Sequence, residues 1–310
     1  MKIGLIGSVD YNRHQWPGAH FNKRMRQFPG IVYECCSLES FEQYLPIVDV
    51  IMLNNTIIKL TTDQAALINS YKKFTVQIHL DPWKSIYNSR VHLDSIVTAA
   101  NSYLKSSIKH FSNRFWSPAC ADILELDLPR DIDIIMWGNS NRKYPFRAFM
   151  FYALRELSIG CKDIGTGIKQ YTITLNNKNY TLLHISGVTR SFSKYYSILL
   201  YEYLNRSKIS LSGTHHVKIP LSKHFENAAC GVLNIGNEFT DKEALGFEHG
   251  KNIWFTDKEK FLNDIQFLLE NPVIVNDITY NAKELIKSSH TIAIRAKELY
   301  NYFYLNTGVE

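Results

Sequence analysis

Short apolar runs alternate with longer segments whose apolar residues recur at helical spacing. Runs of strand length occur at 2–7, 31–36, 49–53, 74–80, 95–99, 132–137, 209–211, 232–235 and 253–255. Helical patterns occur at 19–28, 61–73, 101–110, 145–157, 193–204, 258–269 and 282–303. Strands that alternate with helices in this way are typical of parallel α/β sheets. Since the series occurs twice, the sequence predicts two Rossmann-like domains that face a cleft.

The segment 111–130 separates the two series. It contains Pro118 and Pro129 and shows no clear periodic element, so we expect it to be a linker. The predicted domains span 1–125 and 126–285, and a final helix occupies 286–310.

Two local features, one in each series, refine this prediction. The runs 171–175 and 180–185 alternate around Asn176-Asn177-Lys178-Asn179, which predicts a β-hairpin. Thr61, in the first series, suits the N-cap of the helix that follows it.

Composition indicates a folded protein that we expect in the cytoplasm. The chain has 310 residues and 45% hydrophobic residues, with no apolar run of membrane-spanning length and no signal peptide pattern after Met1. Its five cysteines form no C-x-x-C pair, so we expect reduced thiols rather than disulfides or a zinc site. The net charge of +6 is compatible with a polyanionic partner and equally with an ordinary basic surface.

The stretch 219–239 carries the clearest candidate site. Pro220 and Ser222 suit a helix start, Gly231 suits its end, and a buried strand follows. Glu226 lies in the middle of this helix among small and aromatic neighbours, one turn after Lys223. A carboxylate in such a setting needs a partner, and a ribose diol suits its two acceptor oxygens. The alternative is a partly buried salt bridge to Lys223.

A second group of candidates follows the strand at 132–137. Arg142, Lys143 and Arg147 occupy the loop and first turn of the next helix, where backbone N–H groups also point outward. A diphosphate needs cations or helix N-termini of this kind. A solvated basic helix start is the alternative, but Lys223 places a further cation at a second such position.

Three motifs in the second series resemble the GT-B glycosyltransferases and, more closely, their CgeB-like branch. They match in order and separation over about 131–269: Trp137-Gly138-Asn139, Leu204-Asn205-Arg206-Ser207-Lys208-Ile209, and Phe225-Glu226-Asn227-Ala228-Ala229-Cys230-Gly231. The chain is more loosely similar to phage DNA β-glucosyltransferases, through Leu80-Asp81-Pro82 in the first series.

The resemblance implies a GT-B fold, with an acceptor-side domain at 1–125, a nucleotide-sugar-binding domain at 126–285 and a final helix at 286–310 that packs back on the first domain. It also implies an enzyme that moves a hexose or pentose from a nucleotide-diphosphate sugar, which we expect to be a UDP-sugar. It assigns phosphate binding to Arg142, Arg147 and Lys223 and ribose binding to Glu226. The donor-binding set that we predict on this basis is Gly138, Arg142, Lys143, Arg147, His216, Lys223, Glu226 and Asn227. No cofactor and no metal are expected, because that fold does not require a bound metal.

An inverting transfer needs a base within hydrogen-bond reach of the acceptor hydroxyl. Asp81 is our first candidate because it ends a strand and matches the acid of the DNA glucosyltransferase pattern; a turn-forming Asp-Pro is the alternative. Asp10 and His20, with His14, are reserve candidates from the first loop and its flank. A retaining transfer would need no such base.

Two further patterns have weaker claims. His215 and His216 precede the helix of Glu226, and His216 could face the donor sugar; if they lay on a strand they would point to opposite faces and could not share a metal. Asp131-Ile132-Asp133 resembles the D-x-D metal motif of another glycosyltransferase fold, but here it begins a buried strand, so we discount it.

Three functions remain open from the sequence. The first is sugar transfer to a hydroxymethylated base in double-stranded DNA, favoured by the basic run Lys23-Arg24-Met25-Arg26 and by Asp81. The second is transfer to a cell-envelope or spore glycan. The third is a non-catalytic protein that binds a nucleotide or nucleic acid on the same fold.

Overall fold

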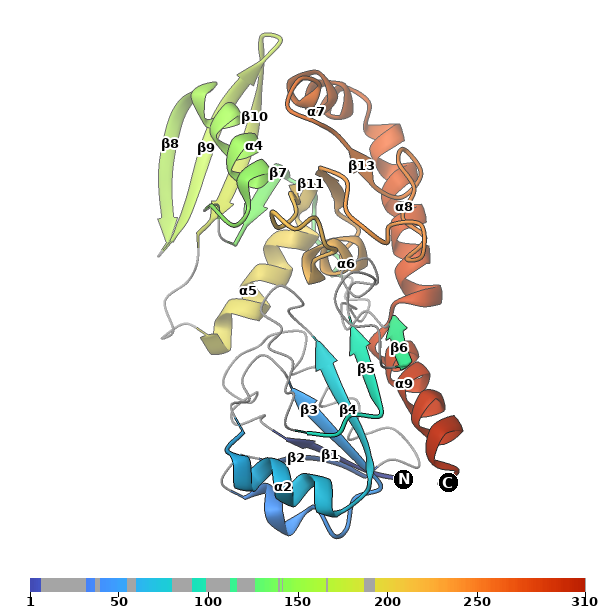
Figure 1. The fold of residues 1–310 in the computed structure, drawn as a ribbon. Coiled ribbons are helices and arrows are strands. Elements are labelled where there is room, and N and C mark those ends of the chain that lie inside the picture. The colour runs from blue at the N-terminus through green and yellow to red at the C-terminus, as the bar shows by residue number, and fades with distance from the viewer. Residues whose placement is uncertain are drawn as a thin grey trace. The chain divides into compact units, whose positions relative to one another are not determined.

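The computed structural model describes residues 1–6, 32–36, 40–54, 60–79, 91–98, 112–115, 126–138, 140, 142–165, 167–186 and 193–309. The chain divides into two compact units, each with its own sheet (Figure 1). Unit 1 comprises Met1–Ala119 and Ile292–Glu310, and unit 2 comprises Cys120–Thr291. The alternation of strands and helices in each unit confirms the predicted α/β class.

Unit 1 contains a parallel sheet. Its described strands are β1 (Lys2–Ile6), β2 (Val32–Cys36), β3 (Val50–Asn54), β4 (Phe74–His79), β5 (Ser95–Thr98) and β6 (Ser112–Phe115). Their order is β2-β1-β3-β4-β5-β6. Strand β6 corrects the prediction that 111–130 carries no regular element. The polar sequence Ser-Asn-Arg-Phe lacks the hydrophobic alternation that identifies a strand, and β6 forms through pairing with β5.

A short 3-10 helix, η1 (Phe41–Gln43), and helix α2 (Thr62–Ser70) pack against this sheet. Thr61 caps α2 as predicted: its hydroxyl accepts from Gln64 N, and the Gln64 side chain accepts from Thr61 N. Buried apolar residues from η1, α2 and the strands form one core, with Phe41, Ile51 and Ile68 at its centre.

The predicted closing helix at 282–303 is wrong, because two helices occupy this region. Helix α8 (Pro272–Ser289) ends at His290, whose Nε2 donates to the Leu245 carbonyl 2.8 Å away. Helix α9 (Ile292–Thr307) then belongs to unit 1, where Phe74 contacts the rings of Tyr302 and Phe303 edge to face. No glycine or proline lies at the break between α8 and α9. The hydrophobic spacing therefore continues across it and predicted one helix instead of two. None of the helices in the described part of the chain has the length and hydrophobicity of a membrane span.

Unit 2 contains a mixed sheet of order β13-β12-β11-β7-β10-β9-β8. Its strands are β7 (Ile132–Trp137), β8 (Ser158–Gly165), β9 (Ile168–Leu175), β10 (Lys178–Ile185), β11 (Ser207–Leu211), β12 (Leu233–Gly236) and β13 (Trp254–Phe255). The five strands from β13 to β10 in that order are mutually parallel. Strand β9 is antiparallel to both of its neighbours, β10 and the edge strand β8.

The predicted hairpin is confirmed as β9 and β10. Asn176 and Asn177 form its two-residue turn with φ of 47° and 58°, a left-handed pair for which asparagine is well suited. Strand β8 was not predicted. It is an edge strand with most of its side chains exposed, so its sequence lacks the alternation that burial of one face imposes.

Helices cover both faces of the unit 2 sheet (Figure 1). Helix α4 (Pro145–Glu156), α7 (Phe261–Glu270) and α8 bury one face, with Met150, Phe261 and Ile278 in the shared core. Helix α5 (Ser193–Asn205) buries the other through Leu200 and Leu204. Helix α6 (Ser222–Ala229) connects β11 to β12.

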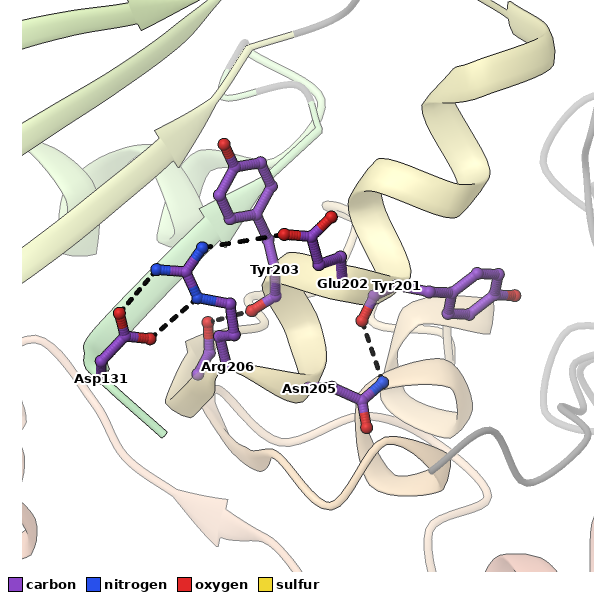
Figure 2. A network of polar contacts seen from close by, with 7 residues as sticks. Asp131, Tyr201, Glu202, Tyr203, Asn205 and Arg206 are labelled. Carbon is purple, nitrogen blue, oxygen red and sulfur yellow. Dashed lines mark hydrogen bonds and ion pairs between the residues drawn. The ribbon is translucent and has the colours of Figure 1, made fainter. Parts of the chain in front are cut away.

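The two aspartates of the D-x-D pattern form ion pairs at the amino end of β7. Asp131 accepts from Arg206 at the end of α5, and Arg206 also contacts Glu202 (Figure 2). The hydrogen bond from Arg206 holds the pKa of Asp131 below its usual value. Asp133 accepts from Lys208 and from Thr181 N. These carboxylates therefore connect the start of β7 to β10, to β11 and to the end of α5.

Candidate functional site

The candidate site lies where the chain reverses its direction across the unit 2 sheet. From β7 the chain passes through α4 to strands on one side, and through α5 it returns to β11 on the other side of β7. In open α/β sheets, ligands bind at the carboxyl ends of the strands at such a point. Here β7 ends at Trp137 and is followed by Gly138, and β11 ends at Leu211 and is followed by Ser212 and Gly213.

Glycine at 213 allows α4 to begin directly on the β11 loop. A Cβ at this position would lie 2.5 Å from the backbone nitrogen of Arg147, closer than any side chain tolerates. On its other side the loop touches Gly236, where a Cβ would lie 3.0 Å from the Ser212 carbonyl carbon. The first turn of α4 is thus fixed against the end of β11, and it carries Arg147.

Arg147 is a buried cation. Its side chain is 1% exposed, its Nη2 donates to the Gly213 carbonyl at 2.8 Å, and its guanidinium lies 4.3 Å from the centre of the Tyr144 ring. Burial lowers its pKa to about 10, so it remains charged at neutral pH.

Lys223, in the first turn of α6, approaches the same point. It is 7% exposed, and its Nζ donates to the Trp137 carbonyl at 2.6 Å. Burial and the charge of Arg147 hold the pKa of Lys223 well below its usual value, while Glu226 opposes this shift.

Gly138 is the position on which the two cations converge. A Cβ built there would lie 3.3 Å from Lys223 Nζ and 3.8 Å from Arg147 Nη1. Its φ of +81° also favours glycine. Two buried cations beside a glycine concentrate positive charge at this point, and a bound anion would offset their mutual repulsion.

Glu226 lies one turn after Lys223 and is 9% exposed. Burial raises its pKa to about 7, and Lys223 opposes this rise. Among the residues that the structure describes, none donates a hydrogen bond to its carboxylate or forms an ion pair with it. The alternative of a Lys223–Glu226 salt bridge is therefore wrong, because the Lys223 ammonium turns to the Trp137 carbonyl instead.

Asn227 belongs to a buried polar network under α6. Its Nδ2 lies 2.8 to 3.0 Å from Ser210 Oγ, Ser212 Oγ and Asn234 Oδ1, and its Oδ1 accepts from Trp137 Nε1 at 2.9 Å. Its side chain is completely buried, so this network leaves it no surface for the donor contact we predicted. We assign it instead to holding α6 against β7, β11 and β12.

His224 fixes the start of α6 and was not predicted. Its Nε2 donates to the Ser212 carbonyl at 2.8 Å, while its Nδ1 accepts from Leu221 N at 3.1 Å. Burial lowers its pKa to about 3, so the ring is neutral and can do both. Nothing in its sequence context distinguishes this histidine from a surface one.

The remaining predicted donor ligands lie at the surface of the same edge. Arg142 and Lys143 are exposed in the turn before α4, and the Lys143 carbonyl accepts from His216 N at 2.9 Å. His215 and His216 lie in the loop after β11 rather than on a strand. His215 is buried against Tyr144, His216 is exposed, and their ring centres are 4.0 Å apart. The candidate bases Asp81, His20 and Asp10, and the reserve His14, lie outside the described residues.

Arg147, Lys223 and Glu226 all lie in a part of the chain that matches a known protein family. A family model described as glycosyl transferase-like matches residues 147–301, half of the chain, from Arg147 through α6 to α9. The chain belongs to this glycosyl transferase-like family. The sequence of this glycosyltransferase matches none of the curated proteins with which it was compared.

Solved structures extend the likeness of this glycosyltransferase to nearly the whole chain. Anabaena HepE in complex with UDP and glucose aligns with a TM-score of 0.64 and 10% identity, over 98% of this chain and 100% of that one. Sucrose-phosphate synthase from Thermosynechococcus elongatus gives 0.63 and 11%, over 98% and 99%. The lipopolysaccharide outer core galactosyltransferase WaaB gives 0.59 and 10%, over 99% and 100%. The shared fold is the GT-B fold, as predicted.

Three residues that shape the site of this glycosyltransferase were not among its predicted site residues. They are Trp137, which was quoted only as part of a family motif, Gly213 and His224. A glycine at the end of a predicted strand is a signal that could have identified Gly213, since close backbone approaches occur there. No group of three potential metal ligands occurs among the described residues.

Proposed function

We propose that this glycosyltransferase takes its sugar from a UDP-sugar and binds that donor at the carboxyl edge of the unit 2 sheet. Arg147 and Lys223 would bind the diphosphate, and Glu226 would accept hydrogen bonds from the ribose hydroxyls. The observation that carries the proposal is that two buried cations, Arg147 and Lys223, converge on Gly138. Glu226 lies one helical turn after Lys223, and its buried carboxylate has no partner among the described residues.

The charges of these groups suit the chemistry of transfer. When the glycosidic bond to the donor phosphate breaks, negative charge develops on the diphosphate that leaves. Cations already fixed in a buried site stabilise this charge without reorganisation. HepE was solved in complex with UDP and glucose, which supports UDP as the nucleotide.

For the acceptor we propose a hydroxyl of a glycan. WaaB, which shares the fold, is a lipopolysaccharide outer core galactosyltransferase. A hydroxymethylated base in duplex DNA stays a prediction that no comparison supports, as does the likeness to the CgeB-like branch and the phage enzymes. The residues that favoured DNA, Lys23, Arg24, Arg26 and Asp81, lie outside the described part of the chain.

The proposal is tested by titrating UDP into the protein and into four variants. Lys223→Met and Glu226→Gln should each weaken binding, Lys223→Met by roughly ten- to a hundredfold because charge-assisted hydrogen bonds are lost. Gly138→Ala should also weaken it, whereas Gly250→Ala should not. Gly250 also has a positive φ, of +73°, but a Cβ built there meets no atom within 4 Å. Its substitution therefore measures the effect of backbone strain alone, without contact with the cations.

Turnover separates an enzyme from a binding protein. We expect release of UDP from one of UDP-glucose, UDP-galactose or UDP-N-acetylglucosamine, stimulated by a glycan acceptor. If Asp81 is the base, Asp81→Asn should abolish transfer and leave UDP affinity unchanged. Failure of UDP to bind at millimolar concentration would overturn the donor proposal. Stimulation by hydroxymethylated DNA that falls steeply with salt would replace the glycan by DNA.

A further inference from the structure

Trp137, the last residue of β7, makes three separate contacts with α6. Its carbonyl accepts from Lys223 Nζ at 2.6 Å, and the centre of its ring lies 4.2 Å from the same nitrogen. Its indole Nε1 donates to Asn227 Oδ1 at 2.9 Å. Lys223 and Asn227 are four residues apart, so they project from one side of the helix. One side chain thus contacts two successive turns of α6.

Lys223 needs such support because its surroundings disfavour an ammonium. It is buried, Arg147 from α4 faces it with like charge, and His224 beside it on α6 is neutral. Glu226 favours the charge only through space, since no ion pair joins the two side chains in the described part of the chain. The Trp137 carbonyl and the face of its ring are the direct contacts that stabilise the cation.

The direction of these contacts also matters. Lys223 Nζ lies 3.3 Å from the position that a Cβ of Gly138 would take, and Gly138 follows Trp137 directly. Because the indole N–H is tied to Asn227, and Asn227 is tied in turn to Ser210, Ser212 and Asn234, the ring cannot rotate without breaking a buried hydrogen bond. The ring therefore fixes where the ammonium lies as well as stabilising it.

We propose that Trp137 is a positioning residue for the donor: its indole holds the Lys223 ammonium beside Gly138, ready for the diphosphate. This inference rests on the donor site proposed above. Trp137 itself is not required to touch the donor.

A double-mutant cycle tests this role. UDP and inorganic pyrophosphate are titrated into the wild type, Trp137→Leu, Lys223→Met and the double variant, with thermal melts confirming that each is folded. Trp137→Leu should weaken UDP binding by between about two- and thirtyfold in the wild-type background, the range that a lost cation–π contact implies. In the Lys223→Met background the same substitution should change binding by less than about twofold.

Trp137→Phe provides a second variant that retains an aromatic face and loses only the indole N–H. It should bind UDP with an affinity between those of the wild type and Trp137→Leu. The pH profile gives a readout that a purely structural role would not move. UDP affinity should fall as rising pH removes the Lys223 proton, and in Trp137→Leu this fall should begin at lower pH, because the charged form has lost a stabilising contact.

The outcomes separate the two proposals. If the losses in Trp137→Leu and Lys223→Met multiply, or if the pH profile of Trp137→Leu matches the wild type, Trp137 does not position Lys223, while the donor site stands. If the wild type binds neither UDP nor pyrophosphate, both proposals fall. Coupling of threefold or more, together with the shifted profile, supports the positioning role.

Discussion

At the scale of single residues, the candidate site is a place where function and stability oppose each other. Glu226 is 9% exposed, and no described residue donates a hydrogen bond to it. A buried carboxylate without such bonds prefers its neutral form, which is why its pKa rises to about 7. Its ionised form is the better acceptor for hydroxyl groups of a ligand. The folded protein without a ligand therefore disfavours the negative charge of Glu226 that ligand binding requires.

Glu226→Gln should stabilise the protein at pH 8 and leave it unchanged near pH 4.5. The pKa of Glu226 rises from 4.5 to about 7 on folding, so the stability that the neutral acid provides is complete below pH 4.5. That stability is lost as pH rises to about 7, by roughly 3 kcal/mol at most. Glutamine does not ionise, so we expect about 1 to 3 kcal/mol of added stability at pH 8. Urea unfolding of unit 2 at both pH values measures this.

Glu259→Gln serves as the control, because Glu259 is exposed and its substitution should leave the pH dependence as in the wild type. UDP titration of Glu226→Gln completes the comparison: the variant that unfolds less readily should bind UDP more weakly. Equal stability of Glu226→Gln and the wild type at pH 8 would contradict the inference that burial of the ionised Glu226 carboxylate destabilises the fold.

At the scale of elements, the site depends on how closely α4 and α6 approach the end of β11. Gly213 lets the first turn of α4 rest on the loop, and His224 ties the first turn of α6 to the Ser212 carbonyl. The two helix starts are therefore held by consecutive residues of one loop. Arg147 and Lys223 converge because of this arrangement and not through contact with each other.

Gly213→Ala should separate these elements. Its Cβ would lie 2.5 Å from Arg147 N, so α4 or the loop must move, at a cost of about 1 to 3 kcal/mol, typical of overpacking. We expect a lower unfolding midpoint and weaker UDP binding, measured by thermal melts and titration. Gly160→Ala in β8 is the matched control, because a Cβ there meets nothing within 4 Å. Similar losses in both variants would show that α4 is not seated on Gly213.

The elements that the sequence predicted are those whose burial produces a pattern. Strand β7 and helix α4 match their predicted bounds closely, because β7 is buried along most of its length and α4 buries one face at helical spacing. Strand β8 has almost no buried face, and β6 has a polar sequence, so neither leaves a hydrophobic signal. The break between α8 and α9 lacks glycine and proline, so the spacing appeared continuous.

For the site, the sequence identified the charged residues and missed those that hold them. Arg147 and Lys223 were predicted because they lie at helix starts, and Glu226 because it lies among small and aromatic neighbours. The roles of Trp137 and His224 depend on contacts between residues far apart in the chain, 90 positions for Trp137 and Asn227. No local pattern encodes such contacts. Likewise, the burial of Asn227 followed from β11 and β12 packing under α6, which spacing along α6 could not show.

At the scale of the whole molecule, the proposed donor site belongs to one unit. Gly138, Arg147, Lys223 and Glu226 all lie within Cys120–Thr291, and each unit has its own buried core. Helix α9 follows unit 2 in sequence but packs in unit 1 through Phe303. We therefore expect a substitution in the core of unit 1 to change stability and to leave a donor site in unit 2 intact.

Phe303→Ala should destabilise unit 1 and leave UDP affinity unchanged. The ring is fully buried and contacts Phe74 with centres 6.5 Å apart, so its loss should cost about 3 to 5 kcal/mol. Leu305→Ala, two residues later on the same helix, removes a side chain that is 79% exposed and should change stability by less than about 0.5 kcal/mol. Calorimetry measures the loss, and UDP titration at 10 °C, where the variant stays folded, measures the affinity. A tenfold loss of UDP affinity in folded Phe303→Ala would mean that donor binding draws on unit 1, since the residues of the proposed diphosphate and ribose contacts all belong to unit 2.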